Sequence, residues 1–113
     1  MIDHATGLKW QQSGSPNYIT YANAEEYIRN LNDERFAGFD DWCLPTLEEA
    51  MSLMEREKKN GDLYIDPVFD RAQRWIWTAD KESAGRAWRV YFLNGYCYLS
   101  DFGYSNYVRA VRS

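Results

Sequence analysis

Two cysteines and several acidic residues are the side chains of this sequence whose types could do chemistry. The stretch "DDWCLPTLEEA" at positions 40–50 places Cys43 beside two acids and directly before a helix start. A cysteine nucleophile needs a base that converts it to thiolate, and histidine is the usual base. The single histidine, His4, lies near the N-terminus, and no pattern brings it to Cys43. We therefore interpret Cys43 as a buried, inert or disulfide-bonded residue.

The same residue types give little support to a metal site. Cys43 and Cys97 have no CxxC spacing, and the sequence has a single histidine to accompany them, so zinc is not indicated. Calcium prefers carboxylate oxygens, but the spacing of the acids matches no known calcium loop. The acids available for calcium are Asp40, Asp41, Asp80 and Asp101. We expect no cofactor and leave calcium open, as we do a disulfide between the cysteines, which depends on geometry and compartment.

Paired carboxylates could also act as a general acid and base. Glu49 is already predicted to cap a helix, and Glu48 lies where a helix N-terminus favours negative charge. The neighbours Asp40 and Asp41 point in different directions, and charged side chains are normally exposed. The sequence contains no Gly-rich phosphate loop, serine-centred elbow or HExxH motif. We therefore predict that the protein is not an enzyme.

Tyrosines are concentrated in the last quarter of the sequence, interleaved with Ser, Asp and Asn. Strand alternation buries only half of them, so the others are expected at the surface. Tyr combines a large contact area with a small entropic cost, and it is common in recognition surfaces. An aromatic layer packed on the sheet is the alternative, and the sequence leaves both open. The candidate ligand-binding residues are Arg89, Tyr91, Tyr96, Tyr98, Ser100, Asp101, Tyr104 and Asn106.

The length and charge narrow the class of protein. A chain of 113 residues corresponds to one domain, 1–113. The net charge of −4 argues against nucleic acid, which is bound by neutralising its phosphates. No apolar run approaches the roughly 18 residues of a membrane span, so we expect no membrane insertion. The first residues do not resemble a signal peptide, and any targeting segment is expected outside this sequence.

Two helices are predicted to position the first half of the chain. Thr20 can cap a helix that runs to about Asn32, with apolar residues at helical spacing. A second helix begins after Pro45 at Thr46, because the Thr-x-x-Glu pattern to Glu49 is a capping box. The stripes comprise Tyr21, Ala24, Ile28 and Leu31 in the first helix, and Leu47, Ala50, Met51 and Met54 in the second. The second helix is expected to continue through "REKKN" and to stop at Gly61.

Strands are predicted after Trp75, where the hydrophobic period becomes two. They cover 75–79, 87–93, 96–102 and 107–112, with Trp88, Val90 and Phe92 opposite Arg89 and Tyr91. Asn94-Gly95 predicts a type I′ turn, which needs positive φ at both residues. Helices followed by antiparallel strands indicate the α+β class.

Several motifs together resemble the Lcl C-terminal domain family, a bacterial domain of unknown function. They are "DHATGLKWQ", "TYANAEEYIRNL", "GFDDWCLPTLEEAMSL", "WIWTA", "AWRVYF" and "YVRAVRS", in this order along nearly the whole chain. The resemblance implies a C-type-lectin-like fold, with two helices packed on a twisted antiparallel sheet and with the termini close together. It also implies an extracytoplasmic adhesion domain of an exported bacterial protein, in the periplasm, at the cell surface or secreted, with carbohydrate or glycosaminoglycan binding as the best-known case.

The chain departs from the family pattern at three points. Cys43 stands where the family usually has Arg, and Ile28 and Ala110 stand where many members have a pair of cysteines. An acidic chain also repels sulfated glycans unless a local basic patch attracts them. The residues available for such a patch are Arg86, Arg89, Arg109 and Arg112.

Three functions follow from these observations. We favour a non-catalytic recognition domain that binds a glycan or protein ligand through the Tyr-rich C-terminal hairpin surface. The second is a cysteine-dependent enzyme using Cys43 and Cys97, since proteins with the C-type-lectin-like fold that the resemblance implies include an oxidase that makes formylglycine. The third is a structural module of a longer surface protein, which would form a homo-oligomer.

Overall fold

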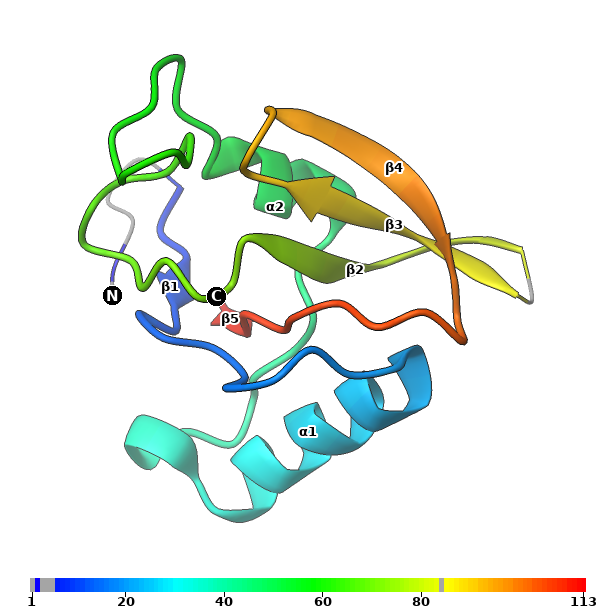
Figure 1. Cartoon of the computed structure of the whole chain (residues 1–113). Coiled ribbons are helices and arrows are strands. Elements are labelled where there is room, and N and C mark those ends of the chain that lie inside the picture. Colours follow the sequence, from blue (N-terminus) through cyan, green and yellow to red (C-terminus); the bar gives the residue numbers. More distant parts are fainter. Residues whose placement is uncertain (1, 3–5, 84) are drawn as a thin grey trace.

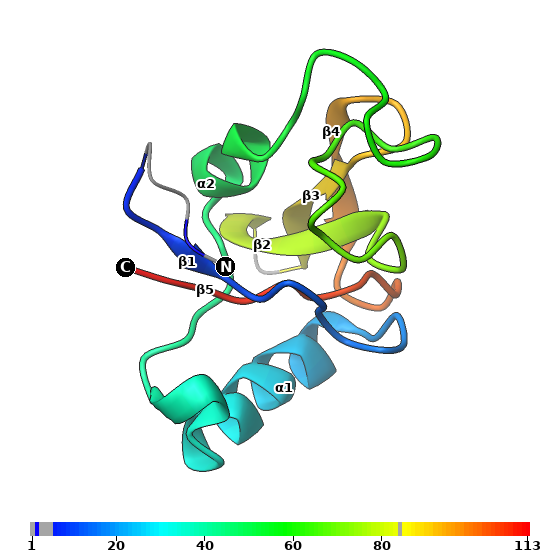
Figure 2. The ribbon, with the colours of Figure 1, turned by 90° about the vertical axis from the view of Figure 1, so that its left-hand side faces the viewer.

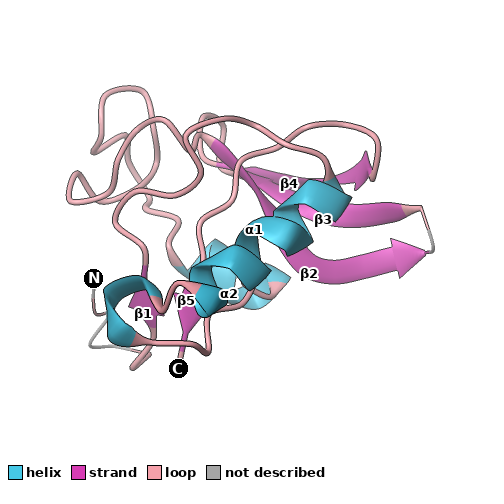
Figure 3. Cartoon of the chain, turned by 90° about the horizontal axis from the view of Figure 1, so that it is seen from below, coloured by secondary structure: helices cyan, strands magenta, loops and turns pink. Residues whose placement is uncertain are grey.

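The described residues of the chain fold into two α-helices and two antiparallel sheets, which confirms the predicted α+β class (Figure 1). The computed structural model describes residues 2, 6–83 and 85–113, so His4 lies outside the described residues. The elements are β1 (Lys9–Trp10), α1 (Tyr21–Asp33), the 3₁₀ turn η1 (Phe36–Gly38), α2 (Leu47–Ser52), β2 (Trp75–Ser83), β3 (Arg86–Tyr91), β4 (Tyr96–Asp101) and β5 (Val111–Arg112). Most of the chain between α2 and β2 is loop (Figure 3).

Helix α1 has the apolar stripe that its sequence predicts. Tyr21, Ala24 and Leu31 are buried, and Ile28 is half-buried. Thr20 occupies the N-cap position with extended backbone, but its side chain accepts no capping hydrogen bond. The helix is instead anchored through Tyr21, whose ring meets that of Trp77 edge-on at 5.0 Å between centroids.

Helix α2 starts as predicted and ends earlier. Thr46 Oγ1 accepts from the Glu49 amide at 3.1 Å, and the Glu49 carboxylate accepts from the Thr46 amide at 2.8 Å. The prediction that this helix continues to Gly61 is wrong, since it ends at Ser52. The amide of Glu55 donates to Tyr64 instead of continuing the helix, because the following loop turns back to bury its own apolar residues. These are Leu63, Ile65 and Phe69.

Strands β2, β3 and β4 form one sheet with β3 in the middle. The ladder aligns Ile76 with Val90 on the face that packs on α2. It places Arg89 opposite Tyr98, and Tyr91 opposite both Trp75 and Tyr96, on the other face. The sheet therefore gathers aromatic residues and one arginine on the face away from α2.

The predicted type I′ turn at Asn94-Gly95 is wrong. Tyr91 pairs with Tyr96, so residues 92–95 connect the strands, and of the predicted turn pair Gly95 alone has positive φ, at 82°. Phe92 causes the difference, because its side chain is fully buried in the core. Its amide donates to Arg74 and its carbonyl accepts from Tyr64, which removes it from the β3–β4 ladder.

The predicted last strand is reduced to two residues of β5, which pair with β1. Before β5 the chain runs extended beside β2, and Tyr107 exchanges hydrogen bonds with Trp75 and Trp77 at 3.0 Å each. On its other side Val108 accepts from the Ser15 amide at 2.8 Å. The β1–β5 pair brings the segments near both ends of the chain together (Figure 2).

Candidate functional site

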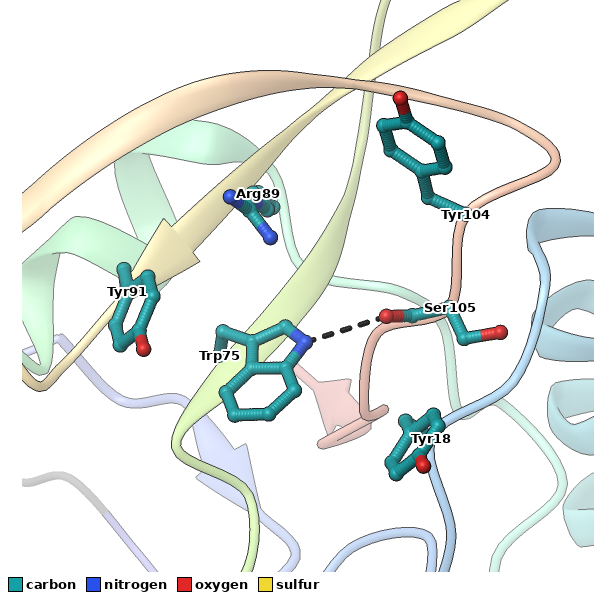
Figure 4. Close-up of a pocket in the computed structure, with 6 residues that line it drawn as sticks. All are labelled: Tyr18, Trp75, Arg89, Tyr91, Tyr104 and Ser105. Carbon is teal, nitrogen blue, oxygen red and sulfur yellow. Dashed lines mark hydrogen bonds between the residues drawn. The ribbon is translucent and has the colours of Figure 1, made fainter.

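The aromatic face of the sheet opens into a concave site of about 380 Å³, here called the aromatic bowl (Figure 4). Its lining residues are Tyr18, Trp75, Arg89, Tyr91, Tyr104 and Ser105. Strands β2 and β3 supply the floor, while the segment before α1 and the loop after β4 supply the rim. The bowl therefore depends on four parts of the chain that are distant in the sequence.

Ring contacts hold the floor of the bowl in place. The centroid of Trp75 lies 5.6 Å from that of Tyr91, 5.2 Å from that of Tyr107 and 6.3 Å from that of Tyr18. Its indole N–H donates to the Ser105 carbonyl oxygen at 3.3 Å (Figure 4). Tilted and edge-on pairs at these separations are favourable. The rings thus support one another before any ligand arrives.

Arg89 is the charged group of the bowl, and buried polar residues hold it from behind. Its Nη1 donates to Asn106 Oδ1 at 3.4 Å, and Asn106 Nδ2 donates to Ser100 Oγ at 3.1 Å. The guanidinium lies 5.7 Å from the ring centroid of Tyr91 and 5.5 Å from that of Tyr98. Among the described residues its Nε has no acceptor, and no carboxylate oxygen lies within 4.0 Å of it.

The lining of the bowl, floor and rim together, carries hydroxyl groups that are free to bind. The residues that carry them are Tyr18, Tyr91, Tyr104 and Ser105, none of which uses its hydroxyl in a hydrogen bond within 6–83 and 85–113. Tyr18 and Tyr104 are 58% and 63% exposed. A hydroxyl can both donate and accept. The lining therefore suits a polar ligand with mixed donors and acceptors.

The structure brings some of the predicted site residues together and separates others. Arg89, Tyr91 and Tyr104 line the bowl, and Tyr98 is their neighbour. Ser100 and Asn106 are buried behind Arg89, where Asn106 accepts from Arg89 and donates to Ser100. The remaining two lie outside the bowl: Tyr96 beside the hairpin turn, and Asp101 at the far end of β4, opposite Arg86.

Sequence reasoning missed Tyr18, Trp75 and Ser105. Trp75 carried a usable signal, because it begins a predicted strand and alternation places it on the face opposite Ile76. Tyr18 carried none, since it reaches the bowl through backbone pairing of Ile19 with Asn106. Ser105 contributes its carbonyl and hydroxyl from the loop after β4.

The four arginines proposed as a basic patch do not form one. Arg86 pairs with Glu82 at 2.9 Å, and Arg112 pairs with Asp41. Arg109 is fully buried and donates to the carbonyls of Gln11, Gln12 and Asp70, and burial lowers its pKa to about 10. Of these four, Arg89 lines the bowl, and it has no carboxylate partner in the described part of the chain.

The two cysteines are free thiols on different elements. Cys97 lies opposite Val90 in the β3–β4 ladder, and Cys43 pairs with Val111 beside β5. Cys43 is exposed and unbridged, so of the three alternatives for this residue burial and a disulfide are wrong, and the inert thiol remains a prediction. Shielding of its thiol raises the Cys43 pKa, and Glu49 and Asp41 raise it further. The sulfur donates to the Val111 carbonyl at 3.3 Å, which suits a protonated, unreactive thiol.

The acids considered for calcium are engaged in other contacts or stand apart. Asp40 pairs with Arg35, and Asp41 pairs with Arg112. Asp80 accepts from the amide of Leu47 at the start of α2. No group of three potential metal ligands occurs among the described residues, and no helix within them is long and apolar enough to cross a membrane.

The positions matching the family's cysteine pair are neighbours in the fold. Ile28 of α1 packs on the cluster that contains Ala110 together with Leu31 and Trp42. Apolar residues of one cluster thus occupy the two positions at which many family members have cysteines.

The family model described as Lcl C-terminal domain matches residues 1–112. No curated protein matches the chain.

Proposed function

Because this chain belongs to the Lcl C-terminal domain family, we propose that it is a non-catalytic recognition domain of an exported bacterial protein. It binds a glycan or protein ligand outside the cytoplasm, and its helices and sheets are a variant of the C-type-lectin-like fold. The ligand contacts the aromatic bowl, with Tyr98 at its edge. Arg89, Tyr91 and Tyr104 make contacts, and Trp75 forms the floor.

The aromatic bowl is the observation that carries this proposal. Ligand sites are concave and mostly apolar, with a few well-placed polar groups. The bowl has this composition, since three tyrosines and a tryptophan surround one guanidinium and a serine. Aromatic and arginine side chains also provide most of the binding energy in recognition surfaces. Rings that already contact one another lose little entropy when a ligand binds.

A cysteine-dependent enzyme receives less support from the same geometry. The Cys43 thiol has a raised pKa, whereas a nucleophile needs a lowered one. The bowl and the Cys43 thiol also belong to different surfaces, because the hollow beside Cys43 is lined by Tyr21, Ile28 and Lys81.

The proposal is tested by screening the purified chain against arrays of oligosaccharides and of surface proteins. For every ligand found, the Kd is compared with those of Tyr18→Ala and Tyr104→Ala, which remove exposed rim rings without breaking a hydrogen bond of the described chain. We expect about a ten-fold loss or more for each, as for truncated contact residues in general.

Tyr96→Ala is the matched control. Tyr96 is 65% exposed, much like Tyr104, but it does not line the bowl. Its substitution should leave the Kd unchanged. The assignment of the bowl is wrong if Tyr96→Ala weakens binding while the two rim variants bind normally.

A further inference from the structure

Arg89 differs from the arginines that the structure pairs on the surface. Arg35, Arg86 and Arg112 each meet a carboxylate, at 3.2, 2.9 and 2.5 Å. Arg29, Arg56, Arg71 and Arg74 also form no ion pair within the described residues, but none of them lines the bowl. Arg89 lines the bowl with one long hydrogen bond to a neutral amide and a buried Nε without an acceptor in the described residues.

The guanidinium of Arg89 is oriented as a binding group. Tyr91 and Tyr98 lie beside it on the same face of the sheet, with their ring centroids 6.4 Å apart. Cation–π contacts of this kind fix the guanidinium without satisfying its N–H donors. A guanidinium offers five donors in a planar fork, which matches the two oxygens of a carboxylate. The N–H donors of Arg89 that have no acceptor among the described residues therefore suit a planar anion.

The rest of the bowl indicates what carries that anion. Unused hydroxyls of Tyr18, Tyr91, Tyr104 and Ser105 surround the arginine, and flat rings lie between them. A sugar ring offers hydroxyls to the hydroxyls and C–H surfaces to the rings. The volume of about 380 Å³ lies at the small end of ligand sites, roughly 300–1,000 Å³, so it suits one or two sugar residues rather than a folded partner.

A densely sulfated glycan fits this surface less well than a carboxylated one. Such a polymer needs several cations along its length. The lining residues include one cation, and Arg86, Arg109 and Arg112 are paired or buried. The chain as a whole carries a net charge of −4. A glycan that places one carboxylated sugar in the bowl needs only one cation, and Arg89 supplies it.

We propose that the aromatic bowl selects a carboxylated, unsulfated sugar residue of a glycan, with Arg89 binding its carboxylate through the guanidinium fork. This inference rests on the proposed function and narrows its ligand to acidic sugars. Ser100 and Asn106 act through Arg89 as positioning residues, because they lie buried behind it.

The test compares oligogalacturonate with the same oligomer after its carboxyl groups have been reduced to alcohols. A sialylated oligosaccharide tests the second source of sugar carboxylate, and a sulfated neutral oligosaccharide and a short peptide with a free C-terminal carboxylate serve as competitors. Binding to the ¹⁵N-labelled chain is followed through the indole N–H signals, among them that of Trp75, which lies on the floor of the bowl. We expect at least one carboxylated sugar to bind about ten-fold tighter than the reduced oligomer, as for a charge-assisted bidentate pair.

Variants of Arg89 test which group makes the selection. Arg89→Gln should abolish the preference for the carboxylated form, and Arg89→Lys should keep part of it, because the charge remains while the fork is lost. Arg86→Gln is the control, since it removes a charge from the same strand outside the bowl. Thermal unfolding of each variant establishes that it is folded at the temperature of the titration.

The outcomes separate this inference from the proposed function. If the reduced oligomer binds equally well and binding is lost in Tyr104→Ala, the bowl is a ligand site and the carboxylate assignment is wrong. Tighter binding of the peptide or of the sulfated sugar than of every carboxylated sugar overturns the ligand class. If no sugar binds at millimolar concentration, this inference fails, and the protein array alone then decides the proposed function.

Discussion

Gly14 lies where the segment before α1 packs directly against the backbone of Val108, and replacing it is a sharp test of the fold behind the bowl. A Cβ at this position would lie 1.8 Å from the Val108 carbonyl oxygen and 2.9 Å from its carbon. Both are backbone atoms, which no rotamer change can move away. Gly14→Ala must therefore push the segment before α1 away from the segment before β5.

The cost follows from the contacts that this separation breaks. Val108 and Ser15 form two hydrogen bonds, one from the Ser15 amide at 2.8 Å and one to the Ser15 hydroxyl at 2.9 Å. Each contributes about 1 kcal/mol to stability. Overpacking of a close contact costs about 1–3 kcal/mol more. We expect Gly14→Ala to lower the free energy of unfolding by about 3–5 kcal/mol, the sum of these contributions.

Urea unfolding followed by tryptophan fluorescence measures this loss, and Gly103→Ala is the matched control. An added Cβ at Gly103 meets no atom within 4 Å, and its φ is not in the left-handed region. Its substitution should change the free energy of unfolding by no more than about 0.5 kcal/mol. Equal urea midpoints for the two variants would refute the reasoning. Gly14→Ala should also weaken ligand binding, because Tyr18 follows on the displaced segment.

Two further predictions concern side chains that accept hydrogen bonds from nearby backbone amides, Thr46 at the start of α2 and Asp70 in the loop before β2. Thr46→Ala removes the hydroxyl that accepts from the Glu49 amide in the α2 capping box. It should lower the free energy of unfolding, measured in urea, by about 1 kcal/mol. Thr20→Ala, at the uncapped start of α1, should cost less than half as much, and equal losses would contradict the role of the box. The pKa of Asp70 is lowered, first by the Ala72 amide that donates to it, so its charge stabilises the fold at neutral pH and this contribution is lost as the pH falls below about 5. Asp70→Asn should therefore lose less stability between pH 7 and pH 3 than the parent chain, and identical pH profiles for Asp70→Asn and the parent would count against the assignment.

The parts of the fold that were predictable are those encoded by neighbouring residues. The capping box of Thr46 and Glu49 depends on a spacing of three and was recognised with both of its hydrogen bonds. The buried face of α1 depends on helical spacing and was recognised in the same way. Such features need no knowledge of the rest of the chain.

The wrong predictions arose where distant contacts outweigh local preference. Asn94-Gly95 is a strong turn signal. Burial of Phe92 nevertheless ends the β3–β4 ladder at the Tyr91–Tyr96 pair, so a two-residue turn at Asn94-Gly95 is not formed. The basic residues after Met54 are typical of the last turn of a helix. Burial of Leu63 and Ile65 in the core stabilises the folded-back loop more than that turn would be stabilised. Propensity differences of a few tenths of a kcal/mol per residue are small beside burial of a large apolar side chain.

The candidate site was predictable in part for the same reason. Alternation along β3 indicated that Arg89 and Tyr91 share a face, and the ladder shows this pairing. It could not indicate that Tyr18 joins them, since that depends on the pairing of Ile19 with Asn106. It also could not reveal which arginines find acids, because Arg112 and Asp41 are far apart in the sequence.

The division of the aromatic bowl into floor and rim has a consequence for its evolution. Trp75 and Arg89 sit on hydrogen-bonded strands, and replacing them disturbs the ladder or the rings around them. Tyr18 and Tyr104 stand on loops, largely exposed, and substitutions at such positions usually change stability by less than about 0.5 kcal/mol. New rim residues can therefore be sampled by mutation with little effect on folding. The surface of the bowl can therefore change one loop residue at a time while the scaffold stays the same.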